Sequence, residues 1–234
     1  MKDLIGQALL DFFYGKYSED IITETNITNP DIMPLPYLFR DYFGMPPIEQ
    51  KALDLCAGTI LDIGCGAGNH SLYLQDKNYT VSAIDISEGA VKVCKLRTIQ
   101  NARQLNILSL KNEQFDTILL LMNGTGIFQT LNKTEKYLNH LKLLLSPKGQ
   151  ILIDSCDIMY MYDTDKNGTP IITNEMPYFG EVEFTMSYKG NKCAPFNWLY
   201  LDEDNFKIRC DKTNLHFEII MRGGDHNYLA RITK

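Results

Sequence analysis

The chain has 234 residues, of which 44% are hydrophobic and 22% are charged, and its formal net charge at pH 7 is -6. This composition predicts one domain with a packed core and excludes a disordered chain. We expect no nucleic-acid partner, because neutralising phosphates requires clustered cations and the acidic chain has no stripe of Lys and Arg. We also expect no membrane partner, since no apolar run approaches the roughly 18 residues of a membrane span.

The cysteines and the first residues bear on the compartment. Six cysteines stand at positions 56, 65, 94, 156, 193 and 210, and none forms a C-x-x-C pair. A zinc site is therefore not expected, and we predict no bound metal. The first fifteen residues lack the basic region and apolar core of a secretory signal. These features predict a cytoplasmic protein.

Short apolar runs alternate with amphipathic stretches between Ala52 and Ser155. The predicted strands are residues 59–63, 80–84, 105–108, 115–122 and 150–154, and the predicted helices are residues 69–76, 87–96 and 136–145. Such alternation predicts an α/β fold with a doubly wound, mostly parallel sheet. Ligands of these sheets bind at the carboxyl ends of the strands.

The end of the chain extends this pattern. A helix is expected over residues 202–212, followed by strands over 215–221 and 227–232. Gly223 and Gly224 mark the turn between these strands, which predicts an antiparallel pair. The complete sheet is then expected to have seven strands with an antiparallel closing strand.

Two segments lie outside the alternation. Residues 1–46 are rich in aromatic residues and prolines, and we interpret them as an N-terminal lid. Residues 157–201 contain two strand-like runs, 181–188 and 198–201, which predict a β-hairpin insertion over the mouth of the site. Residues 1–234 are therefore expected to form a single domain with a lid and an insertion.

A glycine-rich turn follows the first predicted strand of the alternation. Asp62 precedes three alternating glycines, Gly64, Gly66 and Gly68, and a helix then begins. Glycines let the backbone approach a ligand closely. The dinucleotide-binding pattern G-x-G-x-x-G would need a glycine where Asn69 stands. Asp85 ends the second strand, where a carboxylate can accept hydrogen bonds from both ribose hydroxyls of a nucleoside.

The motif Asp62-x-Gly64-x-Gly66-x-Gly68, with Ala83-Ile84-Asp85-Ile86-Ser87 after it, resembles the class I S-adenosylmethionine-dependent methyltransferases. The resemblance implies a Rossmann-like fold and S-adenosylmethionine as cofactor. By this likeness the glycine loop passes beneath the methionine and ribose, Asp62 lies near the methionine ammonium, and Asp85 takes the ribose hydroxyls. The cofactor-binding residues that it implies are Asp62, Gly64, Cys65, Gly66, Gly68, Asp85, Ile86, Asn106, Ile107, Met122 and Asn123. Ile86, Asn106 and Ile107 would lie at the adenine, and Met122 and Asn123 at the transferring methyl.

The resemblance implies methyl transfer by direct in-line displacement, and an acidic chain with an aromatic lid favours a small-molecule acceptor. The candidate bases are Asp154, Asp157, Tyr14 and Tyr37, and the sequence selects none of them as catalytic. Arg40 could hold an anion or form a surface salt bridge. A non-catalytic sensor or scaffold that binds adenosylmethionine remains an alternative. A nicotinamide-dependent oxidoreductase is opposed by Asp62 and Asn69. The oligomeric state and the acceptor stay open.

Overall fold

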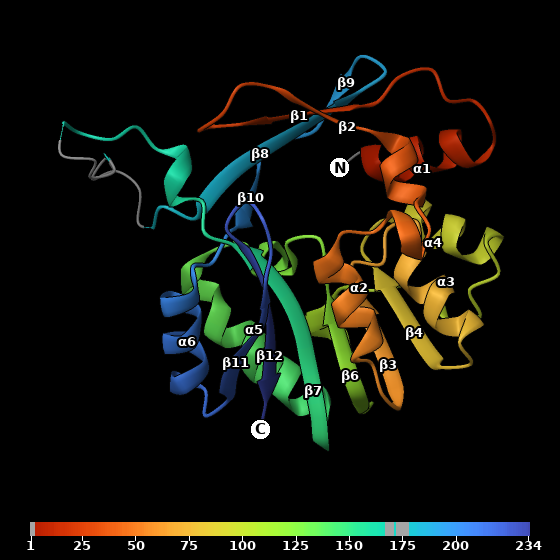
Figure 1. Ribbon diagram of the computed structural model, residues 1–234. Helices are drawn as coiled ribbons and strands as arrows, with labels where there is room; N and C mark the ends of the chain where they lie inside the picture. Colours follow the sequence, from red (N-terminus) through yellow and green to blue (C-terminus); the bar gives the residue numbers. More distant parts are fainter. Residues whose placement is uncertain (1–2, 167–170, 172–177) are drawn as a thin grey trace.

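A seven-stranded sheet forms the centre of the computed structural model, which describes residues 3–166, 171 and 178–234 (Figure 1). Residues 1–2 of the predicted lid, and residues 167–170 and 172–177 of the predicted insertion, lie outside the described residues. The strand order is β11-β12-β7-β6-β3-β4-β5. The strands are β3 (Thr59–Ile63), β4 (Thr80–Asp85), β5 (Ala102–Gln104), β6 (Phe115–Leu120), β7 (Leu145–Cys156), β11 (His216–Arg222) and β12 (Asn227–Thr233). Neighbours are parallel from β7 to β5, and β12 runs antiparallel to both of its neighbours, which confirms the predicted sheet.

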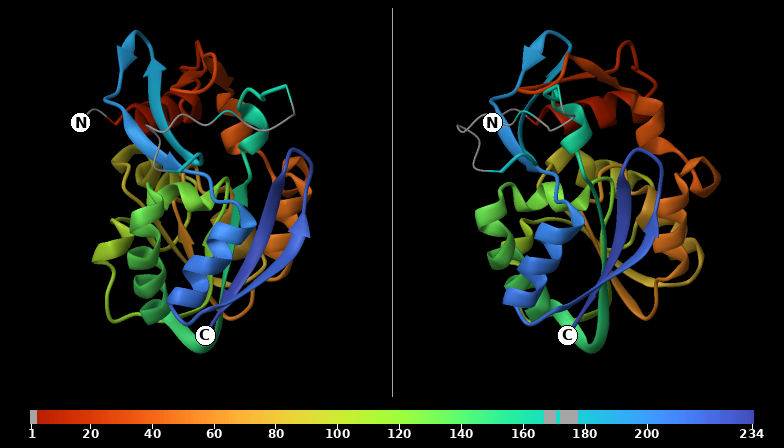
Figure 2. Two further views of the ribbon diagram at one scale, coloured as in Figure 1. Left: turned by 90° about the vertical axis from the view of Figure 1, so that its left-hand side faces the viewer. Right: turned by 60° about the vertical axis from the view of Figure 1, so that its left-hand side comes forward.

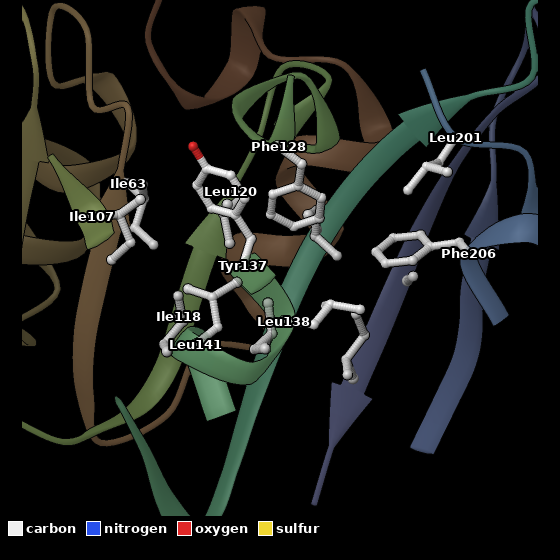
Figure 3. Close-up of a cluster of buried hydrophobic side chains, with 14 of the residues drawn as sticks. Ile63, Ile107, Ile118, Leu120, Phe128, Tyr137, Leu138, Leu141, Leu201 and Phe206 are labelled. Carbon is white, nitrogen blue, oxygen red and sulfur yellow. The ribbon is translucent and has the colours of Figure 1, made fainter. Parts of the chain in front are cut away.

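Helices cover both faces of this sheet. The helices are α2 (Pro47–Asp54), α3 (Asn69–Asp76), α4 (Glu88–Leu96), α5 (Leu131–Leu144) and α6 (Glu203–Lys212). On one face, α5 and α6 bury Leu138, Leu141 and Phe206 against strand residues such as Ile118 and Leu120 (Figure 3). On the other face, α2 and α3 pack on alternate residues of the same strands. Because successive strand side chains point to opposite faces, apolar runs such as Ile118–Leu120 are needed to fill both cores.

A second, smaller sheet lies on the side of the carboxyl ends of the parallel strands (Figures 1 and 2). Its strands are β1 (Ile21–Thr25), β2 (Asp31–Met33), β8 (Glu181–Tyr188), β9 (Asn191–Lys192) and β10 (Phe196–Leu199). The predicted hairpin is confirmed, since β8 and β10 pair antiparallel, although its second strand is Phe196–Leu199 and not the predicted 198–201. The sequence did not predict that β8 also pairs with β1, so the N-terminal segment and the insertion share one sheet. Helix α1 (Leu4–Phe13) packs on α4 beside it.

Two predicted boundaries were wrong for identifiable reasons. The strand expected at 105–108 is instead β5 followed by a short 3-10 helix, η3 (Ile107–Ser109), because the Asn106 side chain accepts a hydrogen bond from the Leu108 backbone N–H at 2.9 Å. The helix expected from residue 136 begins at Leu131. The Leu131 N–H donates to Glu181 of β8 at 2.9 Å, so a residue fifty positions away caps the helix start.

Candidate functional site

The glycine loop after β3 has the backbone that its residues predict. Gly64, Gly66 and Gly68 have φ angles of +73°, +53° and +82°, a backbone region that residues other than glycine rarely adopt. A Cβ on Gly68 would lie 2.2 Å from Ile99, so this glycine also allows close packing. A Cβ on Gly66 would meet nothing nearer than 4.0 Å. The loop therefore leaves open space above Gly66, where a ligand can approach the backbone.

Cys65 contributes only its backbone to this open side of the loop. Its side chain is buried, and its sulfur lies 3.6 Å from the sulfur of Cys94. The hydrogen bond with Cys94, together with burial, raises the pKa of the Cys65 thiol far above its ordinary value, which disfavours the thiolate that a nucleophile needs. Its small volume fits the packing beneath the loop.

Asp85 lies at the end of β4 with its carboxylate oriented by two backbone groups. Gly66 N–H donates to Oδ2 and Ser87 N–H donates to Oδ1, each at 2.9 Å. Because a carboxylate offers about four acceptor positions, two remain for the hydroxyls of a ribose. Burial raises the pKa of Asp85 despite these two hydrogen bonds. The next residue, Ile86, is 71% exposed, so an apolar surface is available to an adenine ring beside the carboxylate.

Asp62 occupies a more enclosed position than the family resemblance implies. Its side chain is 2% exposed, and its Oδ2 accepts a hydrogen bond from the Ser71 hydroxyl at 2.6 Å. Burial raises its pKa. Asp62 thus ties the end of β3 to the first turn of α3, and its interaction with the methionine ammonium stays a prediction.

Asn106 is the N-cap of η3, and Ile107 is the first residue of that helix. Asn106 uses its side-chain oxygen within this turn, as described above. Ile107 is 4% exposed and packs in the core between the sheet and α5 (Figure 3). An adenine amino group could therefore contact the backbone at Asn106 and Ile107, but not the buried Ile107 side chain. This contact stays a prediction.

Asp154 supports the turn that follows β6. Asn123 N–H donates to its Oδ2 at 3.0 Å and Gly124 N–H donates to its Oδ1 at 2.9 Å. Met122 and Asn123 both have positive φ, a strained conformation that these two hydrogen bonds stabilise. Burial raises the pKa of Asp154 to about 6. Among the candidate bases, Asp154 therefore has a structural task, which is to hold the turn that contains Met122 and Asn123.

Strand β10 contacts the same turn, which the sequence did not reveal. The Leu199 carbonyl accepts hydrogen bonds from Asn123 Nδ2 at 3.2 Å and from the Thr125 hydroxyl at 3.0 Å. A Cβ on Gly126 would lie 1.9 Å from the Trp198 ring, so only glycine lets the indole pack there. The small sheet is thus attached to the turn that faces the predicted methyl position. Gly126 was the one visible signal of this contact.

Of the other candidate bases, Tyr14 and Tyr37 are exposed and Asp157 is half-buried. Tyr37 is 40% exposed and Tyr14 is 53% exposed, and burial raises the pKa of Tyr37. The Asp157 carboxylate accepts a hydrogen bond from the Met159 backbone N–H at 2.9 Å, so it caps a local turn. A raised pKa keeps the Tyr37 phenol protonated, which suits a hydrogen-bond donor better than a base.

Arg40 forms a salt bridge, although not at the surface. Its Nη2 lies 2.5 Å from Glu49, and His70 Nε2 lies 2.8 Å from the same carboxylate. The three side chains are 5–9% exposed. The Arg40 guanidinium also stacks 3.8 Å from the centre of the Tyr37 ring. This buried network joins the N-terminal segment to α2 and α3, and it occupies the guanidinium that could otherwise hold an anion.

A second set of contacts joins the N-terminal segment to the glycine loop itself. Asn69 Nδ2 donates to the Leu38 carbonyl at 2.8 Å. Arg97 Nη1 donates to Asn69 Oδ1 at 2.6 Å and to the Ala67 carbonyl at 2.7 Å. Asn69 stands where the dinucleotide pattern has its third glycine, and its side chain here bridges two segments. An ordered glycine loop and an ordered N-terminal segment therefore support each other.

This bridge gives the predicted lid a measurable behaviour. We expect amide hydrogen exchange between Met33 and Phe43 to slow when cofactor binds, because a cofactor that orders the glycine loop also holds Asn69 against Leu38. Exchange in α6, which lies far from the loop, is the internal control and should not change. Equal protection of residues 33–43 with and without cofactor would mean that the segment is a permanent cap.

Comparison with known proteins agrees with this geometry. A family model described as a methyltransferase domain matches residues 56–207. A crystal structure of a SAM-dependent methyltransferase from Bacteroides fragilis, in complex with S-adenosyl-L-homocysteine, is 39% identical and superposes with a TM-score of 0.92 over 99% of this chain and 94% of that one. The putative methyltransferase YqeM of Bacillus subtilis is 26% identical over 42% of each chain. A ubiquinone biosynthesis O-methyltransferase of Pasteurella multocida is 27% identical over 38% of this chain and 35% of its own.

The curated relatives are thus matched over less than half of their own length, whereas the Bacteroides fragilis structure is matched almost throughout. The matched family segment contains the glycine loop, Asp85 and the turn after β6. The chain therefore belongs to the class I S-adenosylmethionine-dependent methyltransferases.

Proposed function

We propose that this protein transfers a methyl group from S-adenosylmethionine to a small-molecule acceptor by direct in-line displacement. The observation that carries the proposal is the Asp85 carboxylate, which two backbone N–H groups hold beside Gly66, a glycine with open space at its Cβ position. The residues present fit the cofactor: the glycine loop admits a close approach, Asp85 has two free acceptor positions, and Ile86 offers an exposed apolar surface.

The chain's own contribution is binding and orientation. Bound S-adenosylmethionine supplies an activated methyl on a positively charged sulfur. Two buried acids, Asp62 and Asp154, lie near the carboxyl ends of β3 and β7, and negative charge on them favours a cation there. The turn held by Asp154 places Met122, which is 38% exposed, where it can align the acceptor against the methyl. We assign no general base.

Two observations support a small acceptor. The second sheet and the N-terminal segment stand over the carboxyl edge of the main sheet, which restricts the approach of a macromolecule (Figure 2). The net charge of -6 disfavours a phosphate backbone.

In the part of the chain that the structure describes, no helix has the length and apolar character needed to cross a bilayer. The cysteines are all free, which supports the proposed cytoplasmic location.

Binding and turnover measurements together test the proposal. We expect calorimetry to show binding of S-adenosylmethionine and S-adenosylhomocysteine and no binding of NAD. A panel of small amines, phenols and quinone precursors should then yield adenosylhomocysteine with at least one acceptor. Tight binding of NAD without binding of adenosylmethionine would refute S-adenosylmethionine as the cofactor of this protein. Binding of adenosylmethionine without turnover across the panel would favour the alternative, a sensor or scaffold.

A further inference from the structure

One carboxylate near the N-terminus joins two helices that are far apart in the sequence. Asp3 Oδ1 accepts a hydrogen bond from Gly6 N–H at 2.9 Å and so caps α1. Its Oδ2 accepts from the Ser87 hydroxyl at 2.8 Å and from Gly89 N–H at 2.9 Å. Ser87 in turn is the N-cap of α4. Asp3 therefore connects the start of α1 directly to the start of α4.

The close approach of the two helices makes this connection specific. A Cβ on Gly89 would lie 2.5 Å from the Gly6 backbone, so both helices come together at glycines. Leu9 and Ala90 are buried in one shared apolar cluster behind this contact. The position of Asp3 is thus fixed by packing, and its carboxylate has little freedom to bond elsewhere.

The same Ser87 belongs to the cofactor site. Its backbone N–H is one of the two groups that orient the Asp85 carboxylate, at 2.9 Å. The path from Asp3 to Asp85 consists of the Ser87 hydroxyl, the Ser87 backbone and one further hydrogen bond. The cap of the first helix is therefore two hydrogen bonds away from the predicted ribose-binding group.

We propose that Asp3 is a positioning residue for the ribose end of the cofactor site. It does not touch the cofactor; it fixes Ser87, so that the Ser87 N–H holds Asp85 Oδ1 in the direction of the ribose hydroxyls. This proposal rests on the proposed function, because it assumes that Asp85 receives the ribose. Its consequence is that Asp3 controls how strongly the site distinguishes a ribose from a deoxyribose.

The test compares binding of S-adenosylhomocysteine with binding of its 2′-deoxyribose analogue by calorimetry, on the full chain. For the unmodified protein we expect the analogue to bind about tenfold more weakly, because one charge-assisted hydrogen bond is missing. In Asp3→Ser, a serine can still cap α1 but is too short to reach Ser87 and Gly89. We expect the preference for the ribose compound to fall to roughly threefold or less. Asp3→Ala should behave in the same way.

Asp11→Asn is the matched control. It removes the same charge from the same helix, but Asp11 accepts hydrogen bonds from Tyr188, the last residue of β8 in the small sheet, and from Lys189, which follows it. Its ribose preference should equal that of the unmodified protein. If Asp3→Ser lowers affinity for both compounds equally, or restores the unmodified behaviour that Asp3→Ala loses, Asp3 is only a helix cap and the proposal is wrong. If the unmodified protein binds S-adenosylhomocysteine and its 2′-deoxyribose analogue equally well, Asp85 does not receive the ribose hydroxyls. That result would refute the role of Asp85 and, with it, the role proposed for Asp3.

Discussion

Replacing Asp85 by alanine is expected to weaken the binding of S-adenosylmethionine at least tenfold while the fold is retained. A carboxylate that holds two ribose hydroxyls makes charge-assisted hydrogen bonds worth about 1.5–3 kcal/mol each. Burial raises the pKa of Asp85, so its charge does not stabilise the fold without cofactor. Alanine leaves the Gly66 and Ser87 N–H groups without their acceptor, which should lower the free energy of unfolding by about 1–3 kcal/mol. Loss of the carboxylate should therefore cost affinity and some stability while the protein stays folded. Calorimetry measures the first quantity and thermal unfolding without cofactor measures the second.

Asp76→Ala is the matched control, because it removes an exposed acid from the end of α3, away from the glycine loop. It should leave cofactor affinity within about twofold, since exposed charges interact weakly across solvent. An Asp85→Ala protein that is folded and binds with unchanged affinity would place the ribose elsewhere.

Replacing Glu49 by glutamine is expected to lower the free energy of unfolding by about 3–5 kcal/mol. Glu49 is 4% exposed and is the shared partner of Arg40 and His70. A neutral amide in its place leaves the Arg40 guanidinium buried without a compensating charge. Urea unfolding without cofactor measures the loss, and the slope of the transition should not change.

Glu218→Gln provides the comparison for this variant, because its ion pair with Arg231 spans 3.4 Å and is partly exposed. Exposed pairs contribute about 0–1 kcal/mol. The double variant Arg40→Met, Glu49→Leu should regain most of the stability, since it removes both buried charges. A loss below about 1 kcal/mol in Glu49→Gln would show that water reaches the network and replaces the missing charge.

The pH dependence of this effect has a defined sign. Burial acts to raise the pKa of Glu49, but the hydrogen bond from His70 and the charges of His70 and Arg40 outweigh it and hold that pKa below the ordinary value. A carboxyl group with a lowered pKa in the folded state contributes stability above its unfolded pKa, and this contribution is lost as pH falls through the folded pKa. The difference in the free energy of unfolding between the unmodified protein and Glu49→Gln should therefore become smaller below about pH 4.3.

The sequence predicted the central strands and the glycine loop because their signals are local. The last three residues of β6, Ile118–Leu120, are all apolar, and Gly64, Gly66 and Gly68 require a backbone that few other residues adopt. The edge strand β5 was misplaced because it is three residues long and carries Arg103 and Gln104, so it has almost no apolar pattern.

The sequence could not predict contacts whose partners come from distant elements. The charged network combines Arg40, Glu49 and His70 from three segments, and a sequence pattern does not indicate which charges will be buried together. The same holds for Asp154, which the sequence offers as a candidate base. In the structure its carboxylate instead accepts hydrogen bonds from the backbone N–H groups of the turn after β6. In both cases the packing of separate elements, rather than local spacing, brings the groups together.

The pairing of β1 with β8 has a consequence for synthesis of the chain. The Glu183 N–H donates to Asn26, which lies 157 positions earlier in the chain. At a translation rate of roughly 5–20 residues per second, one edge of β1 remains without its partner for roughly 8–30 s on the ribosome. During that time β1 can pair locally with β2 only, and its other edge is open to a strand of another nascent chain. The small sheet is accordingly completed late, after the glycine loop of the predicted cofactor site has been synthesised.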